Sequence, residues 1–190
     1  FAAHTPADKS NTVDLFDALL TFSSEHRRSN DHVIDVVKKF RGAEYRVRVF
    51  PAAITREGKT VLVLPSRRES LIEKAVRKLA ADGISASVTR DKDGECEVWV
   101  RFSLYKLRSL LAGLGHGYKS VELREGIEVL HGARMEVIMA SGSGVACFQS
   151  GIFQAILWRT HRDKLNERPK AQVCVKLHPL LTRAIAQYTF

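Results

Sequence analysis

Apolar residues recur at helical spacing in two neighbouring segments near the middle of the chain. Four leucines share one face of residues 102–113, and Leu123, Ile127 and Leu130 do the same in residues 119–131. A repeat of three to four residues places apolar side chains on one side of an α-helix. The pattern therefore predicts two consecutive amphipathic helices.

The loop between these helices is short and rich in glycine. Residues 112–117 read Ala-Gly-Leu-Gly-His-Gly, and Ser120 stands where its hydroxyl can accept a hydrogen bond from the first N–H groups of the second helix. Segment 102–139 is therefore predicted to be a helix-turn-helix followed by a strand. The helix-turn-helix is a motif typical of DNA-binding proteins.

The rest of the chain divides into helix-like and strand-like segments. Ser66 and Glu69 match a capping box, which predicts the start of a helix. The other predicted helices cover residues 12–24, 32–40, 66–82 and 180–187. The other predicted strands cover residues 45–50, 60–64, 84–89, 95–100, 145–158 and 172–177, and the first two form a hairpin or lie as neighbours.

The order of these elements is that of a winged helix. A helix, a strand, the helix pair, a strand, a hairpin and a last strand give a three-helix core with a β-hairpin beside it. We therefore expect an α+β fold: a helix-turn-helix core with a β-hairpin wing, together with N-terminal helices and a further β-hairpin. Residues 1–44 are expected to form a partly helical extension and residues 45–190 the winged-helix domain, with the charged segment 161–170 on the wing.

Charge adds a class of partner to this picture. Thirty Lys and Arg against 21 Asp and Glu give a formal net charge of +9 and a pI near 9.7. That balance favours polyanionic partners, such as DNA, RNA or an anionic membrane surface. No apolar run approaches the ~20 residues that span a bilayer, so we expect DNA rather than a membrane as partner.

Motifs for catalysis or metal binding are absent from the sequence. The three cysteines lie far apart without C-x-x-C spacing, and the seven histidines never stand at the i, i+4 spacing of a helical metal site. A G-x-x-x-x-G-K-[ST] phosphate loop is also missing, and residues 141–144 read as a hairpin turn. We expect a protein that is not an enzyme, holds no metal or cofactor, and works in a reducing cytoplasm.

Five motifs, taken in order, resemble the first winged-helix domain of bacterial plasmid replication initiators. The resemblance covers roughly residues 45–190 and has these parts: Gly-Lys-Thr-Val-Leu-Val-Leu-Pro-Ser-Arg-Arg-Glu at 58–69, the helix at 72–80, Phe-Ser-Leu-Tyr-Lys-Leu at 102–107, Glu-Leu-Arg-Glu-Gly-Ile-Glu-Val-Leu at 122–130, and Val-Cys-Val-Lys-Leu-His-Pro-Leu-Leu at 173–181.

This resemblance implies a function in starting plasmid DNA replication in the bacterial cytoplasm. Residues 45–190 would dimerise and contact the backbone of origin DNA, while a second domain outside this chain would do most of the sequence reading. The implied partners are DNA with origin repeats, a second copy of the chain, and host replication proteins. No cofactor is implied.

Ten residues are candidates for contact with DNA. They are cations and one serine, on the helix pair and on the wing: Lys106, Arg108, Lys119, Ser120, Arg124, Arg159, Arg162, Lys164, Arg168 and Lys170. Flexible cations suit phosphate contacts, which position a protein without reading bases. Glu122, Glu125 and Glu128 crowd the second helix and oppose DNA unless they point away. We therefore expect DNA contact mainly at the wing; the alternatives are a solvated helix and a solvated charged loop.

Two other functions compete with this interpretation. A winged-helix transcriptional regulator, with a sensory region in residues 1–95, has the same element order and charge. A nuclease or relaxase is the third possibility, and it lacks the carboxylate or histidine cluster that metal-dependent cleavage requires.

Overall fold

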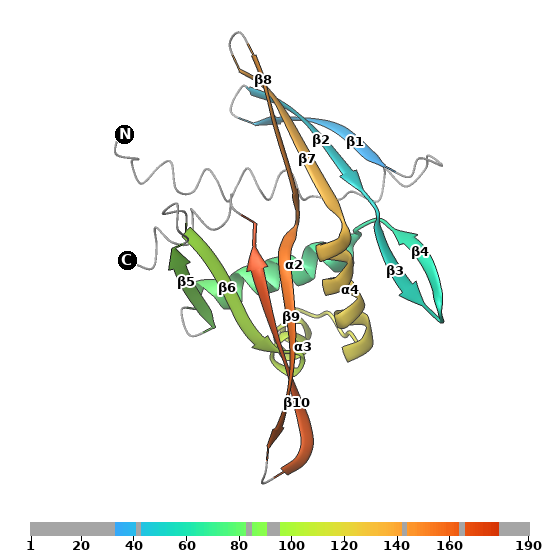
Figure 1. Ribbon diagram of the computed structural model, residues 1–190, viewed down its shortest axis with the longest axis vertical. Coiled ribbons are helices and arrows are strands. Elements are labelled where there is room, and N and C mark those ends of the chain that lie inside the picture. The colour runs from blue at the N-terminus through green and yellow to red at the C-terminus, as the bar shows by residue number, and fades with distance from the viewer. Residues whose placement is uncertain are drawn as a thin grey trace.

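The described part of the chain has an α+β fold built from two antiparallel sheets, one separate hairpin and three helices (Figure 1). The computed structural model describes residues 33–40, 43–82, 85–90, 96–141, 144–163 and 166–178. Within these ranges no helix combines the length and apolar character needed to cross a membrane. The predicted helices at 12–24 and 180–187 lie outside the described residues.

The first sheet contains four strands in the order β1-β2-β7-β8. They are β1 (Ile34–Phe40), β2 (Ala43–Phe50), β7 (Arg134–Ser141) and β8 (Gly144–Gly151), and all neighbours are antiparallel. Val47 faces Val36 on one side and Val137 on the other, and both Val47 and Val137 are buried. This row forms the apolar face of the sheet.

Strand β1 corrects the helix predicted over residues 32–40. Its residues pair with β2 from Ile34↔Val49 to Phe40↔Ala43. The segment begins Ile-Asp-Val-Val, and β-branched residues favour an extended backbone when a neighbouring strand is present. Strand β1 lies in the expected extension (residues 1–44) and pairs with β2, most of which lies in the expected domain (residues 45–190). The division of the chain into these two parts stays a prediction.

The separate hairpin consists of β3 (Ala52–Arg56) and β4 (Lys59–Val63). Its turn has positive φ at Glu57 and Gly58, as a two-residue hairpin turn of type I′ requires. The expected pairing of residues 45–50 with 60–64 is wrong, because β4 pairs with β3 and β2 lies between β1 and β7. Residues 52–56 form the strand that the sequence pattern had not indicated.

Three helices carry most of the core. They are α2 (Arg67–Ala81), α3 (Leu104–Gly113) and α4 (Ser120–Gly132), and the leucines at 107, 111, 123 and 130 are fully buried. The Glu69 carboxylate accepts a hydrogen bond from the Ser66 N–H at 2.7 Å, as the capping box predicts. Ser120 is not the cap of α4: it is the first helical residue, and Lys119 precedes it in the cap position.

The second sheet has the order β5-β6-β10-β9 and is antiparallel throughout. Its strands are β5 (Ala86–Arg90), β6 (Cys96–Ser103), β9 (Phe153–Asp163) and β10 (Asn166–Leu177). The α+β class is thus confirmed. The hairpin of β9 and β10 is the one that the winged-helix prediction treats as the wing, and that finer assignment stays a prediction.

The single strand predicted over residues 145–158 is two strands in different sheets. Strand β8 ends at Gly151 and β9 begins at Phe153, with Ile152 fully buried between them. A Cβ on Gly151 would lie 3.0 Å from the carbonyl oxygens of both His131 and Phe153. The close backbone approach at this glycine accompanies the passage of the chain from one sheet to the other.

Gly132→Ala is expected to lower the free energy of unfolding. The new Cβ would lie 2.9 Å from the Cβ of Ala52, which is fully buried and can move only with the β3 backbone. Overpacking of this kind costs about 1–3 kcal/mol. Gly113→Ala is the matched control in urea unfolding, since Gly113 ends α3 and its Cβ would meet nothing within 4 Å. Equal stability of the two variants would contradict the contact.

Candidate nucleic-acid interface

Helix α3 and the start of α4 expose both cationic and apolar side chains, and we name this region the α3–α4 surface. Lys106, Arg108, Lys119 and Arg124 are exposed on it, as is Ser120. The surface also exposes three large apolar side chains, namely Tyr105 at 70%, Leu114 at 54% and Val121 at 76%. Cations with exposed apolar groups at the start of a helix can contact phosphates and base edges.

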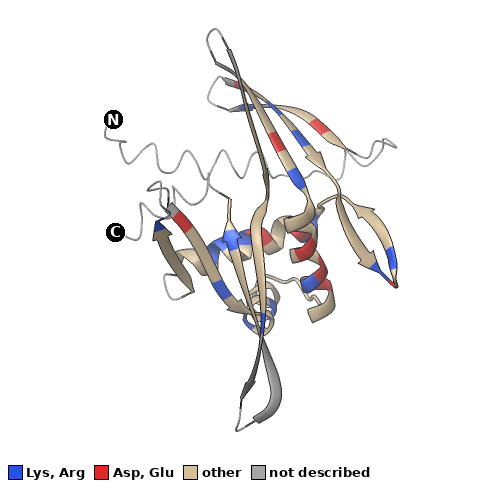
Figure 2. Ribbon diagram, viewed as in Figure 1, with Lys and Arg blue, Asp and Glu red and all other residues tan. Residues whose placement is uncertain are grey.

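Both cations on α3 have neighbours within the chain. Lys106 Nζ donates to Ser85 Oγ at 3.0 Å, and the Arg108 guanidinium lies over the Tyr105 ring, 5.6 Å from its centroid. Neither contact is an ion pair, so both positive charges stay uncompensated among the described residues. Figure 2 shows cations and no acidic residue on α3, whereas α4 carries Glu122, Glu125 and Glu128 beside Arg124.

The three glutamates of α4 are each engaged within the chain. Glu122 accepts the Lys119 N–H at 2.6 Å, and Glu128 accepts from Arg124 Nε at 3.1 Å. Glu125 is the least exposed of the three and turns toward α2 and the β3–β4 hairpin. The carboxylate in the middle of the helix is therefore held by arginines of α2 and the hairpin.

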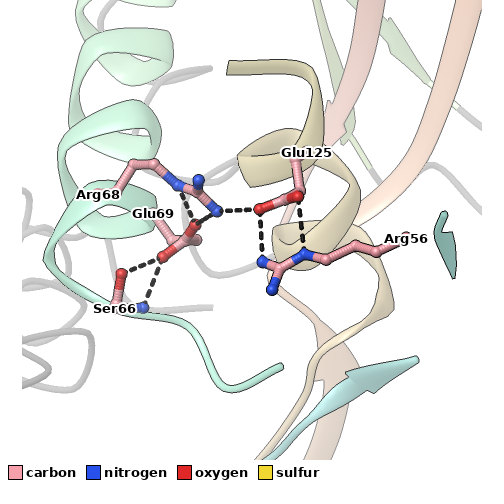
Figure 3. A network of polar contacts seen from close by, with 5 residues as sticks. All are labelled: Arg56, Ser66, Arg68, Glu69 and Glu125. Atoms are coloured by element: carbon pink, nitrogen blue, oxygen red, sulfur yellow. Dashed lines mark hydrogen bonds and ion pairs between the residues drawn. The ribbon is translucent and has the colours of Figure 1, made fainter. Parts of the chain in front are cut away.

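Glu125 belongs to a charged network of five residues (Figure 3). Arg56, the last residue of β3, donates to both carboxylate oxygens of Glu125, from Nε at 2.9 Å and from Nη2 at 2.7 Å. Arg68 of α2 donates to Glu125 at 2.9 Å and to Glu69 at 2.7 Å. Glu69 in turn accepts from both the backbone and the hydroxyl of Ser66.

This network joins three elements that are distant in sequence. We name it the Arg56–Glu125 network; it comprises Arg56, Ser66, Arg68, Glu69 and Glu125. Two guanidinium groups balance two carboxylates in it. The ion pairs of the network contribute unequally to folding stability, because the side chain of Glu69 is 1% exposed whereas that of Arg56 is 47% exposed. Ion pairs at exposed positions contribute little, and pairs that involve a buried charge contribute much more when broken.

Stability is expected to fall in acid partly through Glu125. The hydrogen bonds from Arg56, supported by Arg68, lower the pKa of Glu125 from 4.5 to about 2. A carboxyl whose pKa is lower in the folded state stabilises the fold above pH 4.5, and this contribution is lost as the pH falls toward 2. Urea unfolding of Glu125→Gln should therefore show a flatter pH dependence over that range, and a slope equal to that of wild type would contradict this role of Glu125.

The predicted site residues do not share one surface. The Arg124 guanidinium lies over the Trp158 ring at 4.9 Å, which places Trp158 on the face of β9 that meets α4. Successive strand residues point to opposite faces, so the exposed Arg159 lies on the other face of the second sheet. The side chains of Arg162, Arg168 and Lys170 are outside the described part of the structure, as is all of Lys164, so the expected wing contacts stay a prediction.

A second polar cluster crosses the first sheet away from this surface. Arg46 binds Asp35 with two hydrogen bonds at 2.7 and 2.8 Å, and Arg48 bridges Asp35 at 3.2 Å and Glu136 at 3.3 Å. The Arg46 hydrogen bond, with support from Arg48, lowers the pKa of Asp35. These arginines are occupied by carboxylates within the sheet, and the cluster gives the first sheet little net positive charge to offer DNA.

Groups of His, Cys, Asp and Glu suited to a metal ion are not found within the described ranges. No protein-family model and no curated protein matches the chain. Among solved structures, a crystal structure of RctB domains 2–3 matches with a TM-score of 0.51 and 8% identity, over 83% of this chain and 55% of that one. A selenomethionine structure of RctB domains 2 and 3 matches with a TM-score of 0.51 and 9% identity, over 86% and 57%.

These matches concern the fold, since the identities are below 10%. The chain shares an overall arrangement of helices and sheets with RctB domains 2–3. It spans a little more than half the length of each of those chains.

Proposed function

We propose that this chain is a DNA-binding part of a replication initiator. The observation that carries the proposal is the fold shared with RctB domains 2–3, which belong to a replication initiator. The five-part sequence resemblance to plasmid initiators supports the same function, as does the formal charge of +9. We further propose a role without catalysis, in the bacterial cytoplasm, at a plasmid origin.

The surface of α3 and α4 is the best-supported place for DNA contact. Lys106, Arg108 and Lys119 are exposed and form no ion pair with a described residue. Glu125, the carboxylate that would oppose binding from the middle of α4, is turned inward and paired with two arginines. This arrangement supports backbone contact by α3 and the start of α4, with the β9–β10 hairpin as a further contact.

Dimerisation and host-protein contacts form the finer part of the proposal. Strand β9 is an edge of the second sheet, and Leu157 on it is 42% exposed. An edge strand offers unpaired backbone groups to another chain. Sedimentation equilibrium tests the dimer, and a strict monomer up to ~100 μM would argue against it; at that concentration even a weak dimer, with Kd near ~100 μM, populates detectably.

Binding of the chain to duplex DNA at several salt concentrations tests the function. Backbone contact predicts that log K falls linearly with log salt, with a slope of about −0.9 for each phosphate neutralised. Four phosphate contacts would give a slope of about −4. The affinities for origin repeats and for unrelated duplex would then differ little, because phosphate contacts do not read the base sequence. Absence of binding even at low salt would contradict the proposal, and a strong preference for a promoter over origin repeats would favour a transcriptional regulator.

A further inference from the structure

Helix α4 carries three carboxylates beside the proposed interface. Glu128 is paired with Arg124 of the same helix, and Glu122 accepts a hydrogen bond from the backbone N–H of Lys119. Glu125 receives its compensation from outside the helix, from Arg56 and Arg68. The net charge that α4 offers to DNA therefore depends on how two other elements are docked against it.

Arg68 alone cannot compensate Glu125. Its guanidinium is shared with Glu69, which is 1% exposed and has no other cationic partner among the described residues. Removing the counter-charge costs more free energy for a buried carboxylate than for a partly exposed one. Without Arg56, two carboxylates would share a single guanidinium, and the network would carry a net charge of −1.

We propose that Arg56 is a positioning residue for DNA binding: from the β3–β4 hairpin, it cancels the charge of Glu125 and holds the carboxylate against the hairpin and α2. The proposal rests on the proposed function of the α3–α4 surface. Arg56 holds both carboxylate oxygens of Glu125 in a bidentate pair, a geometry that fixes orientation as well as charge. The hairpin thereby becomes part of the DNA-binding apparatus without touching DNA.

The packing around Glu125 supports this fixed geometry. Gly126 follows Glu125, and a Cβ there would lie 2.4 Å from Ile72 Cδ1 and 3.4 Å from a Glu69 oxygen. Helices α4 and α2 therefore meet closely beside the network. At the end of α4, Gly132 meets Ala52 at the start of β3, so the hairpin is docked at both of its ends relative to the helix.

A four-variant binding experiment tests the proposal, using the full chain and a fluorescent duplex at neutral pH and ~0.1 M salt. Arg56→Gln is expected to weaken binding about fivefold, since one uncompensated charge near several phosphates costs about 1 kcal/mol at the high effective dielectric of a surface. Arg56→Gln combined with Glu125→Gln should restore wild-type affinity within about twofold. Glu125→Gln alone should bind as tightly as wild type or more tightly.

Lys59→Gln is the matched control. Lys59 lies across the hairpin turn from Arg56, is exposed, forms no ion pair with a described residue, and loses the same charge. Its affinity should stay within about twofold of wild type, because the cost of Arg56→Gln comes from the freed carboxylate. The deficit of Arg56→Gln should also shrink as salt rises, since salt screens exposed charges. A purely structural loss would not follow salt in this way.

The outcomes separate the proposal from the function on which it rests. If wild type binds and Arg56→Gln binds equally well, the positioning role is overturned and DNA binding stands. If the double variant stays as weak as Arg56→Gln, Arg56 touches DNA itself and the positioning role is again overturned. If wild type does not bind duplex DNA, the proposed function fails. Should Arg56→Gln not fold, Glu125→Gln decides the proposal: binding at least as tight as that of wild type supports it, and weaker binding overturns it.

Discussion

Arg68→Ala is expected to lower the free energy of unfolding by about 3 kcal/mol, because it leaves the buried Glu69 carboxylate without its cation. Breaking a buried pair from one side costs about 3–5 kcal/mol. The lower end applies here because Glu69 keeps its hydrogen bonds from Ser66. Thermal unfolding should show a drop in Tm of roughly 6–12 °C for a chain of this size.

Arg67→Ala provides the control for this loss. Arg67 is the neighbouring residue and the first of α2, but it is exposed and makes no ion pair with a described residue. Surface substitutions of that kind change stability by about 0.5 kcal/mol or less. If both variants unfold at the same urea concentration, Arg68 does not hold Glu69 in the way that the distances indicate.

Removing three cations from the α3–α4 surface is expected to abolish most DNA binding. Lys106→Gln, Lys119→Gln and Arg124→Gln together should weaken binding about 100-fold at 0.1 M salt and reduce the salt slope by about 3, since each phosphate contact contributes about 0.9 to that slope. All three side chains are exposed; Lys106 lies on α3, Lys119 caps α4 and Arg124 lies in the second turn of α4. Fluorescence anisotropy across a salt series measures both quantities.

A triple variant of equal charge change controls for the overall loss of positive charge. Lys39→Gln, Lys59→Gln and Lys74→Gln lie on β1, β4 and α2, and all three lysines are exposed. Long-range attraction depends on net charge, whereas phosphate contact depends on position. A similar loss of affinity in both triple variants would show that net charge, rather than the α3–α4 surface, drives binding.

The helices could be predicted because their signals are local. The leucine spacing of α3 and α4 and the Ser66–Glu69 capping box all lie within a few residues, and each element appears where the pattern places it. The turn of the β3–β4 hairpin follows the same logic, since Gly58 supplies a positive φ at low cost. Short-range patterns of this kind persist in the folded chain when tertiary contacts do not oppose them.

The sequence pattern gives the wrong element where a segment's secondary structure depends on partners distant in the sequence. Residues 34–40 form a strand because β2 lies alongside, and β2 is itself fixed by β7, almost ninety residues further along the chain. The break between β8 and β9 depends on close backbone contacts at Gly151 with two other segments. Periodicity within a short window carries no information about such neighbours.

The same limit applies to the candidate site. The glutamates of α4 are visible in the sequence as a group that opposes DNA, but their directions are not. Arg56 and Arg68 are 69 and 57 residues away from Glu125, so nothing local could pair them. The structure turns Glu125 inward and thereby makes α4 a better candidate for DNA contact than the sequence suggested. It also separates Arg159 from Arg124, which the sequence had grouped by charge alone.

Photo-cross-linking from Val121 tests directly whether the α3–α4 surface faces DNA. Val121 is the second residue of α4 and is 76% exposed, and Val37 on β1 of the first sheet is a comparable control at 56% exposure. A benzophenone amino acid would replace each valine in turn, with labelled duplex DNA at low salt. Cross-links are expected from position 121 and few from position 37. Cross-links from position 37 with none from position 121 would contradict it.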